Sequence, residues 1–186
     1  MNGLENWFCA SGFWRRMTEQ RWLPWLLQEV NLGEHVLEVG AGPGAATTEL
    51  TRRASRVTSL EYSHNFCVKL RTEISAVVVQ GDAAALPFAS GTFTSAIAVL
   101  VLHHLRSAEA QDVTFAEISR VLRPGGIFAA LEIDNGWLTR ALHFRSTFVP
   151  VSSQRLAPRL AAVGFANVDI ESRSGGFALR AEKRKV

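Results

Sequence analysis

Residues 35–45, which read HVLEVGAGPGA, decide how the rest of the chain is interpreted. The first half of this stretch is an apolar run typical of a buried β-strand. The second half is a loop with glycine at positions 40, 42 and 44. Glycine permits tight turns with positive φ and lets another group come very close to the backbone. We therefore expect a ligand to bind against this loop, and the question is which ligand.

Length and composition predict one intracellular domain spanning residues 1–186. The chain is 47% hydrophobic and carries a formal charge of +3, so it can bury a core and is only mildly basic. A short basic stretch at 180–185 is interpreted as a solvated end rather than a nucleic-acid arm. Cys9 and Cys67 lack metal-ligand spacing, which predicts no disulfide framework and no metal site. With no signal-peptide pattern and no apolar run near 20 residues, we expect a cytoplasmic protein without stable membrane insertion.

Strand-like and helix-like patterns alternate along the chain. This alternation predicts a doubly wound, mostly parallel α/β sheet with helices on both faces. The last two strands are separated by Ser174-Gly175-Gly176 and are expected to form a hairpin that adds an antiparallel element at one edge. The expected strands are 36–39, 56–61, 76–82, one within 92–105, 126–133, 167–172 and 177–183, and the expected helices are 45–54, 63–74, 107–122 and 158–163.

Several details of the helices are also predicted. Ser63 and Ser107 are expected to cap the helices that follow them. In the helix after Ser107 we expect Val113, with Ile118, Val121 and Leu122, to be buried. Pro158 is expected in the first turn of its helix, where a proline is well tolerated.

Three acidic residues stand at the ends of successive expected strands. In an open parallel sheet, ligands bind at the carboxyl ends of the strands. Glu38 precedes the glycine loop, Glu61 ends the second strand and Asp82 ends the third. The loop satisfies the dinucleotide pattern GxGxx[GA], but that signal is weak alone, and the Lys-Ser/Thr of a triphosphate loop is missing. Acids facing an amine, a ribose and an adenine suit S-adenosylmethionine, which carries a sulfonium and an amino acid but no phosphate.

Five motifs in order resemble the class I S-adenosylmethionine-dependent methyltransferases. They are VLEVGAGPG, GDAAALPFASGTF, VLHHL, EISRVLRPGG and LAAVGF. The match is to the ubiquinone/menaquinone biosynthesis methyltransferase-like (type 11) group and covers about residues 30–183. It implies a Rossmann-like methyltransferase fold, a seven-stranded sheet whose last strand is antiparallel, with residues 31–186 as the cofactor-binding core.

The resemblance also implies roles for individual residues. The glycine loop would hold the methionine end of the cofactor, Glu61 the ribose, and Asp82 with Ala83 the adenine. One departure is Phe93-Thr94, where the family usually has Phe-Asp, so one common acid is absent. The residues expected to bind S-adenosylmethionine are Glu38, Gly40, Ala41, Gly42, Gly44, Glu61, Tyr62, Asp82, Ala83 and Val99.

The catalytic residue is not determined by the sequence. The sulfonium methyl is already activated, so the reaction needs mainly alignment and desolvation. A base is required only if the acceptor loses a proton as it attacks. His103 and His104, directly after the fourth strand, are the natural candidates, and His143 in the short segment 134–151 is another.

The N-terminal residues 1–30 are unusually aromatic and are expected to form a helical cover. Three interpretations compete: a helix packed on the sheet, a lid over the cofactor and acceptor, and an anchor on a membrane surface. Residues 17–30 have helical spacing, whereas 6–14 look too irregular to pack as a helix. We expect Trp7, Phe8 and Trp14, with His103, to border the pocket of a flat or apolar small molecule.

Other functions remain as alternatives. An NAD-dependent oxidoreductase could use the same loop and Glu61, but the Tyr-x-x-x-Lys pair is missing, since Tyr62 is the sole tyrosine. A non-catalytic S-adenosylmethionine-binding protein would bind the cofactor without turnover. An RNA methyltransferase is not expected, because no basic-aromatic stripe is present, and we expect no nucleic-acid partner. The identity of the acceptor and the oligomeric state stay open.

Overall fold

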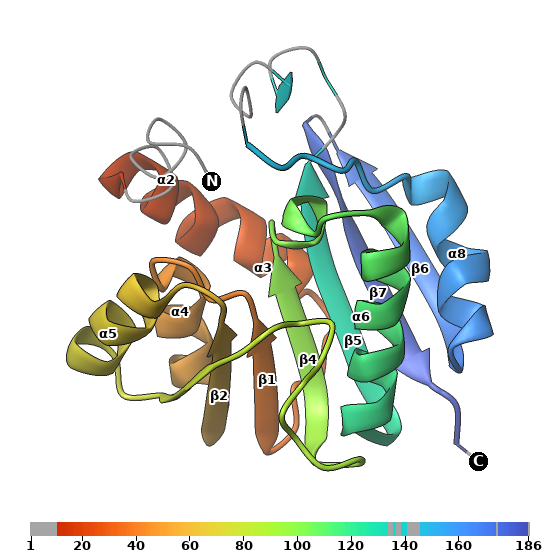
Figure 1. The fold of residues 1–186 in the computed structure, drawn as a ribbon, viewed down its shortest axis with the longest axis horizontal. Helices are drawn as coiled ribbons and strands as arrows, with labels where there is room; N and C mark the ends of the chain where they lie inside the picture. The colour runs from red at the N-terminus through yellow and green to blue at the C-terminus, as the bar shows by residue number, and fades with distance from the viewer. Residues whose placement is uncertain (1–10, 134–135, 137–138, 141–145, 174, 186) are drawn as a thin grey trace.

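The computed structural model describes residues 11–133, 136, 139–140, 146–173 and 175–185. They form one seven-stranded sheet with strand order β3-β2-β1-β4-β5-β7-β6 (Figure 1). β7 runs antiparallel to β5 and to β6, while the other pairs are parallel. The predicted doubly wound, mostly parallel sheet with an antiparallel C-terminal strand is confirmed. The elements are α2 (Gly12–Met17), the π-helical turn η1 (Thr18–Trp22), α3 (Leu23–Leu26), β1 (His35–Val39), α4 (Ala45–Arg53), β2 (Arg56–Glu61), α5 (His64–Glu73), β3 (Val77–Gln80), β4 (Phe93–Val99), the 3-10 turn η2 (Leu102–His104), α6 (Ala108–Val121), β5 (Leu122–Ile133), α8 (Ser153–Ala162), β6 (Phe165–Arg173) and β7 (Gly176–Lys183).

β1 is buried along its whole length because helices cover both faces of the sheet. Successive side chains of a strand point to opposite faces. Leu37 and Val39 therefore join the core beneath α6 and α8, whereas Val36 joins the core beneath α3 and α4. In Figure 1, α6 lies in front of the sheet and α3 behind it. The alternation places Glu38 on the same face as α4.

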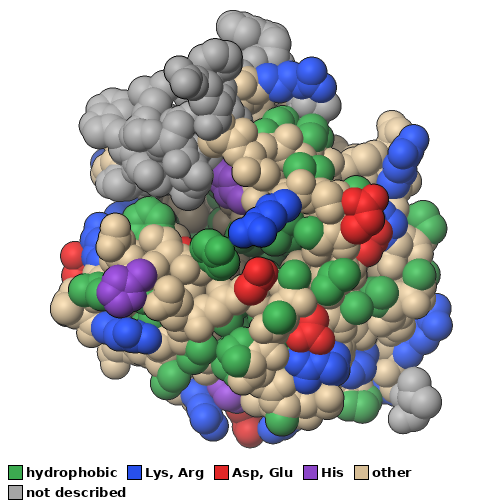
Figure 2. All heavy atoms as spheres, viewed as in Figure 1, with side chains coloured by type: hydrophobic (Ala, Val, Ile, Leu, Met, Phe, Trp, Pro, Cys, Tyr) green, Lys and Arg blue, Asp and Glu red, His purple; other side chains and the backbone are tan. Residues whose placement is uncertain are grey.

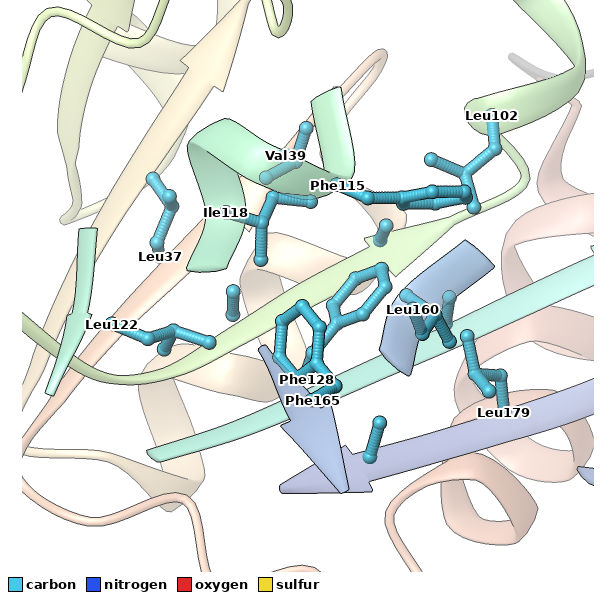
Figure 3. Packing of buried hydrophobic residues seen from close by; sticks show 14 of the residues in the cluster. Leu37, Val39, Leu102, Phe115, Ile118, Leu122, Phe128, Leu160, Phe165 and Leu179 are labelled. Atoms are coloured by element: carbon cyan, nitrogen blue, oxygen red, sulfur yellow. The ribbon is translucent and has the colours of Figure 1, made fainter. Parts of the chain in front are cut away.

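Aromatic side chains form the centre of the core beneath α6 and α8 (Figure 3). The ring of Phe128 on β5 lies between Phe115 of α6 and Phe165 of β6, at centroid distances of 6.1 and 5.7 Å. All three side chains are fully buried. Burial of one such side chain contributes about 1.5–3 kcal/mol to stability, so this cluster ties β5, β6 and α6 together.

The N-terminal segment is helical from residue 12 to residue 26. Trp25 is buried against the sheet, and its indole N–H donates to Glu171 at 2.7 Å. The Arg180 guanidinium of β7 donates to the carbonyl groups of Trp25 and Leu26, which satisfies acceptors that the end of a helix leaves open. The packed helix expected within 17–30 is therefore present. The expectation that residues 6–14 are irregular was wrong for residues 12–14, because Ser11 caps α2 through the Trp14 N–H. Residues 6–10 lie outside the described residues.

Some predicted details of the helices were wrong. Val113 is 48% exposed, because it lies two residues, or about 200° around the helix, from the buried Phe115. α8 begins at Ser153 rather than at the proline, so Pro158 lies inside the helix. Ser63 precedes α5 without a capping hydrogen bond. Ser107 does cap α6, accepting from the Ala110 N–H.

The fourth strand lies within the predicted range 92–105, and the C-terminal hairpin lies at one edge of the sheet as predicted. β4 ends at Val99, and Leu100 has φ +56°, so the chain turns where the apolar run continues. The C-terminal hairpin does extend the sheet at one end, but β7 lies between β5 and β6, so β6 forms the edge.

Candidate active site at the carboxyl edge of the sheet

The site is built where β2, β1 and β4 end side by side. These three strands are neighbours and run parallel, so the loops that follow them meet at the same edge of the sheet. Glu38 and Glu61 lie within the last residues of β1 and β2, and Val99 is the last residue of β4. The structure therefore brings together residues that the sequence predicted from three separate segments.

The three glycines of the loop after β1 are explained by different structural reasons. A side chain at Gly40 would overlap Val101, and one at Gly44 would overlap Leu70 and Ile74 of the α5 segment. At Gly42 a side chain would meet open space, although its φ of +53° still favours glycine. The protein's own packing thus explains two of the glycines. Gly42 is the position whose backbone is open to a ligand.

Glu38 is a buried carboxylate with one unsatisfied oxygen. Glu38 is only 2% exposed. Oε2 accepts from the hydroxyl groups of Thr47 and Ser59 at 2.7 and 2.6 Å. Oε1 has no hydrogen-bond partner among the described residues. Burial raises the pKa of Glu38 to about 7, with a smaller contribution from the charge of Glu61. Such a carboxylate fits a cationic donor that could satisfy Oε1.

Glu61 is hydrogen-bonded to the glycine loop. One carboxylate oxygen accepts from the Gly42 N–H at 2.8 Å, and the other accepts from the Ser63 N–H at 2.7 Å. Glu61 is buried, so its carboxylate is held in one place by the backbone around it. This position, beside the open backbone of Gly42, suits an acceptor for the hydroxyl groups of a bound molecule.

Of the remaining predicted binding residues, Asp82 and Tyr62 are exposed, whereas Ala41 is buried. Asp82 follows β3, and its Oδ1 accepts from the Ala84 N–H at 2.9 Å, which shapes the loop that contains Ala83. Tyr62 is exposed after β2, and its hydroxyl accepts from Arg106 at 3.4 Å. Asp82 can therefore present its second oxygen to a ligand.

The sequence did not single out Glu132, which lies near the end of β5. Its side chain is fully buried, and Oε1 accepts from the backbone N–H groups of Val101 and Leu102 at 3.1 and 2.7 Å. Oε2 accepts from His103 Nδ1 at 2.5 Å. Glu132 thus holds the three residues 101–103 of the segment that follows β4. The one signal was an acid inside the apolar run GIFAALEI.

His103 and His104 lie on η2 rather than on a strand. Their rings are 4.1 Å apart, and the His103 ring also contacts Phe148 at 5.6 Å. Both follow β4, which ends at Val99, as the sequence predicted. His103 is buried, and His104 is half-buried.

The expected aromatic border is only partly within the described part of the chain. Trp7, Phe8 and His143 lie outside the described residues. Trp14 is half-buried on α2, which lies above α4 on the side toward which the arrows of β1 and β4 point (Figure 1). Within the described ranges, no three His, Cys, Asp or Glu side chains gather to hold a metal ion, and no helix is long and apolar enough to cross a membrane.

Comparison with known proteins agrees with this geometry. Residues 37–130, which are 94 of the 186 residues, match the family described as methyltransferase domain. A demethylmenaquinone methyltransferase of Corynebacterium efficiens is 28% identical over 160 residues, covering 86% of this chain and 64% of the relative. A fatty-acid O-methyltransferase of Mycolicibacterium smegmatis is 39% identical over 101 residues, covering 52% of this chain and 36% of the relative. The chain thus spans about a third to two thirds of these curated relatives.

A solved structure shows the same fold. The crystal structure of an S-adenosylmethionine-dependent methyltransferase of Thermotoga maritima superposes with a TM-score of 0.77 at 18% identity, covering 97% of this chain and 94% of that one. The unsatisfied oxygen of Glu38 and the open backbone at Gly42 fit the cofactor of such enzymes, which is cationic and carries no phosphate. The chain therefore belongs to the methyltransferase domain family, in the type 11 group of class I methyltransferases.

Proposed function

We propose that this protein methylates a small, flat or apolar acceptor at the carboxyl edge of the sheet. The observation that carries the proposal is the buried carboxylate of Glu38, which has an unsatisfied oxygen next to the glycine loop. The bound cofactor supplies a methyl group already activated on a sulfonium. The task of the chain is then to bind, align and exclude water.

Each residue of the site has a proposed role in holding the cofactor. Glu38 pairs with the ammonium of the methionine end, and the open backbone of Gly42 lets that end come close. Glu61 accepts hydrogen bonds from the ribose hydroxyls. Asp82 with Ala83 binds the adenine, and the backbone of Val99 lines the cofactor from β4.

The acceptor is proposed to be a small molecule rather than a nucleic acid. Two relatives are named for quinone-type and fatty-acid acceptors, and both kinds of molecule are apolar over most of their surface. On the face shown in Figure 2, Lys and Arg side chains are interspersed with Asp and Glu instead of forming a basic stripe. A nucleic-acid enzyme would need such a stripe to contact phosphates.

The N-terminal segment is proposed to cover this acceptor. Residues 1–186 would then act as one domain, with 1–30 as a cover on the cofactor-binding core 31–186. In support of this role, Trp14 belongs to α2, which lies above α4 on the side toward which the arrows of β1 and β4 point (Figure 1). Trp14→Ala is expected to lower turnover, whereas Phe13→Ala, which removes an exposed side chain, serves as the control. Equal turnover of both variants would contradict the role of Trp14.

Two measurements test the function directly. Isothermal titration with S-adenosylmethionine and with NAD should show binding of S-adenosylmethionine alone. A screen of phenols, fatty acids and other small metabolites should then release S-adenosylhomocysteine with at least one acceptor. Binding of NAD without S-adenosylmethionine would support an oxidoreductase instead. Cofactor binding without turnover on any acceptor would support a non-catalytic binding protein.

A further inference from the structure

An ion pair on α6 binds the backbone of the loop that follows β3. Glu117 and Arg120 are paired through two nitrogen–oxygen contacts of 2.7 and 2.8 Å. The Glu117 carboxylate also accepts from the Leu86 N–H at 2.8 Å. The Arg120 guanidinium donates to the carbonyl groups of Leu86 and Phe88 at 3.0 and 2.7 Å. Both side chains of the pair therefore bind the same short piece of backbone.

The chemistry of the two side chains suits this task. The hydrogen bonds from Arg120 lower the pKa of Glu117; burial opposes this effect, and the bond from the Leu86 N–H adds to it. The carboxylate is therefore ionised at neutral pH and holds the guanidinium in place. A guanidinium is a flat fork of donors that can bind a carboxylate and two carbonyl groups at once, which the compact ammonium of a lysine does less well.

Leu86 directly follows a tight turn that begins at Asp82. The Ala84 N–H donates to Asp82 Oδ1 at 2.9 Å, and the Ala85 N–H donates to the Asp82 carbonyl at 3.0 Å. Asp82 and Ala85 also form an isolated antiparallel bridge. A change in the direction of the backbone at Leu86 would therefore be passed through this turn to Asp82.

The turn is attached to the rest of the fold at both ends. At its start, the Gly81 N–H donates to the Glu61 carbonyl at 3.0 Å, so β2 holds this end. At its finish, the buried side chain of Leu86 belongs to the core beneath α6 and α8. Burial determines where the Leu86 side chain lies, while the hydrogen bonds to its N–H and its carbonyl determine how its backbone is turned.

We infer that the Glu117–Arg120 pair positions Asp82 to recognise the amino group of adenine, and thereby sets the preference of the site for adenine over other purines. This inference rests on the proposed function, in which Asp82 and Ala83 bind the adenine. Asp82 is exposed, so its position depends on the turn that carries it rather than on tight packing. Glu117 and Arg120 are positioning residues that act through the loop.

The first test measures whether the pair holds the turn, and it needs no ligand. Amide hydrogen exchange is followed by NMR in the cofactor-free protein. In Arg120→Met, exchange at Ala84 and Ala85 should become about 10-fold faster or more, because the turn opens more often. Exchange at Gly81, which β2 holds, should keep its wild-type rate. Unchanged exchange at Ala84 and Ala85, or equal acceleration at all three residues, would overturn the inference.

Arg53→Met provides the matched control. Arg53 pairs with Glu49 at 2.7 Å, and its side chain is 38% exposed, against 36% for Arg120. This ion pair joins two residues of α4 and lies outside the loop that follows β3. Arg53→Met should therefore leave the exchange rates at Ala84 and Ala85 unchanged.

The second test measures recognition of the amino group by calorimetry. The two ligands are S-adenosylhomocysteine and its purine analogue, in which hydrogen replaces the 6-amino group. The wild type and Arg53→Met should prefer the amino ligand about 10-fold or more, the value of a hydrogen bond to a charged group. Asp82→Ala should bind both ligands almost equally, and in Arg120→Met the preference should fall below about 3-fold. A purely structural role of Arg120 would lower both affinities alike and leave this ratio unchanged.

The outcomes separate failure of the inference from failure of the proposed function. If Asp82→Ala loses the preference and Arg120→Met keeps it, only the inference is overturned. If the wild type shows no preference, the proposed adenine role of Asp82 fails, and the inference fails with it. If Arg120→Met does not fold, Glu117→Gln replaces it in both tests, because its amide N–H₂ would face the Arg120 Nε donor. An unchanged preference in Glu117→Gln would then overturn the inference.

Discussion

Glu38 provides the sharpest test of the cofactor site, because its charge is costly to the fold and useful to the ligand. Burial raises its pKa from an ordinary 4.5 to about 7. A raised pKa means that the folded state favours the protonated acid, so this stabilisation is complete below about pH 4.5 and is lost as the pH rises through 7. At about 1.4 kcal/mol for each pH unit, the loss amounts to about 3 kcal/mol.

The variant Glu38→Gln imitates the protonated acid. Its amide oxygen can still accept from the Thr47 and Ser59 hydroxyls, which now contact one carboxylate oxygen. Urea denaturation should give similar stabilities for the variant and the wild type at pH 4.5. At pH 8 the variant should be more stable by about 3 kcal/mol, because it has no charge to bury.

Cofactor binding should change in the opposite direction. A neutral amide cannot pair with an ammonium, so titration calorimetry at pH 8 should show weaker binding of S-adenosylmethionine by about 1.5–3 kcal/mol. Glu73→Gln is the control, because Glu73 is exposed on α5 and makes only a 4.0 Å pair with Lys69. If the wild type and Glu38→Gln show the same dependence of stability on pH, the raised pKa of Glu38 is contradicted. Unchanged affinity would remove Glu38 from the cofactor site.

Two further predictions concern the glycine loop and the other acids. Gly40→Ala should destabilise the fold by about 2–4 kcal/mol through overlap with Val101 and strain at positive φ, and Val101→Ala in the same chain should restore part of this loss. Gly42→Ala should lower stability by only about 1–2 kcal/mol through backbone strain but should weaken S-adenosylmethionine binding. Stability is measured by urea denaturation and binding by calorimetry. Equal losses of stability and of affinity in the two variants would contradict the separate roles of Gly40 and Gly42. Glu61→Ala and Asp82→Ala should each weaken S-adenosylmethionine binding by about 1–3 kcal/mol in calorimetry. Glu61→Ala should also lower stability because it leaves two N–H groups without their acceptor. Asp82 is exposed, so Asp82→Ala should leave stability unchanged. A loss of stability in Asp82→Ala would argue against the proposed position of Asp82 at the adenine.

The sheet and the position of the glycine loop could be predicted because they depend on local patterns. An apolar run that ends in glycines, followed by helical spacing, indicates a strand and a turn wherever it occurs. The placement of Glu38 and Glu61 at one edge could be predicted as well, since the ends of neighbouring parallel strands must meet there. The three glycines, however, look alike in sequence, and only packing distinguishes Gly42 from its neighbours.

The segment after β4 could not be predicted because its shape depends on distant residues. The apolar run through Leu100 looks like continuous strand, yet Leu100 adopts a positive φ. The hydrogen bonds that hold the following turn come from Glu132, about 30 residues away. The local sequence around residues 100–103 cannot predict a contact with a residue so far along the chain. Pro158 is a similar case, because tertiary packing carries α8 across a residue that normally begins or ends a helix.

The place of β7 in the sheet has a consequence for the order in which the nascent chain assembles. β6 is synthesised before β7, yet β7 separates β6 from β5. Until β7 emerges from the ribosome, β5 presents an open edge, and β6 has no strand through which to join the sheet. The same late strand carries Arg180, whose guanidinium closes the carbonyl end of α3, made some 150 residues earlier. The two ends of the described fold can therefore be joined only after β7 has been synthesised.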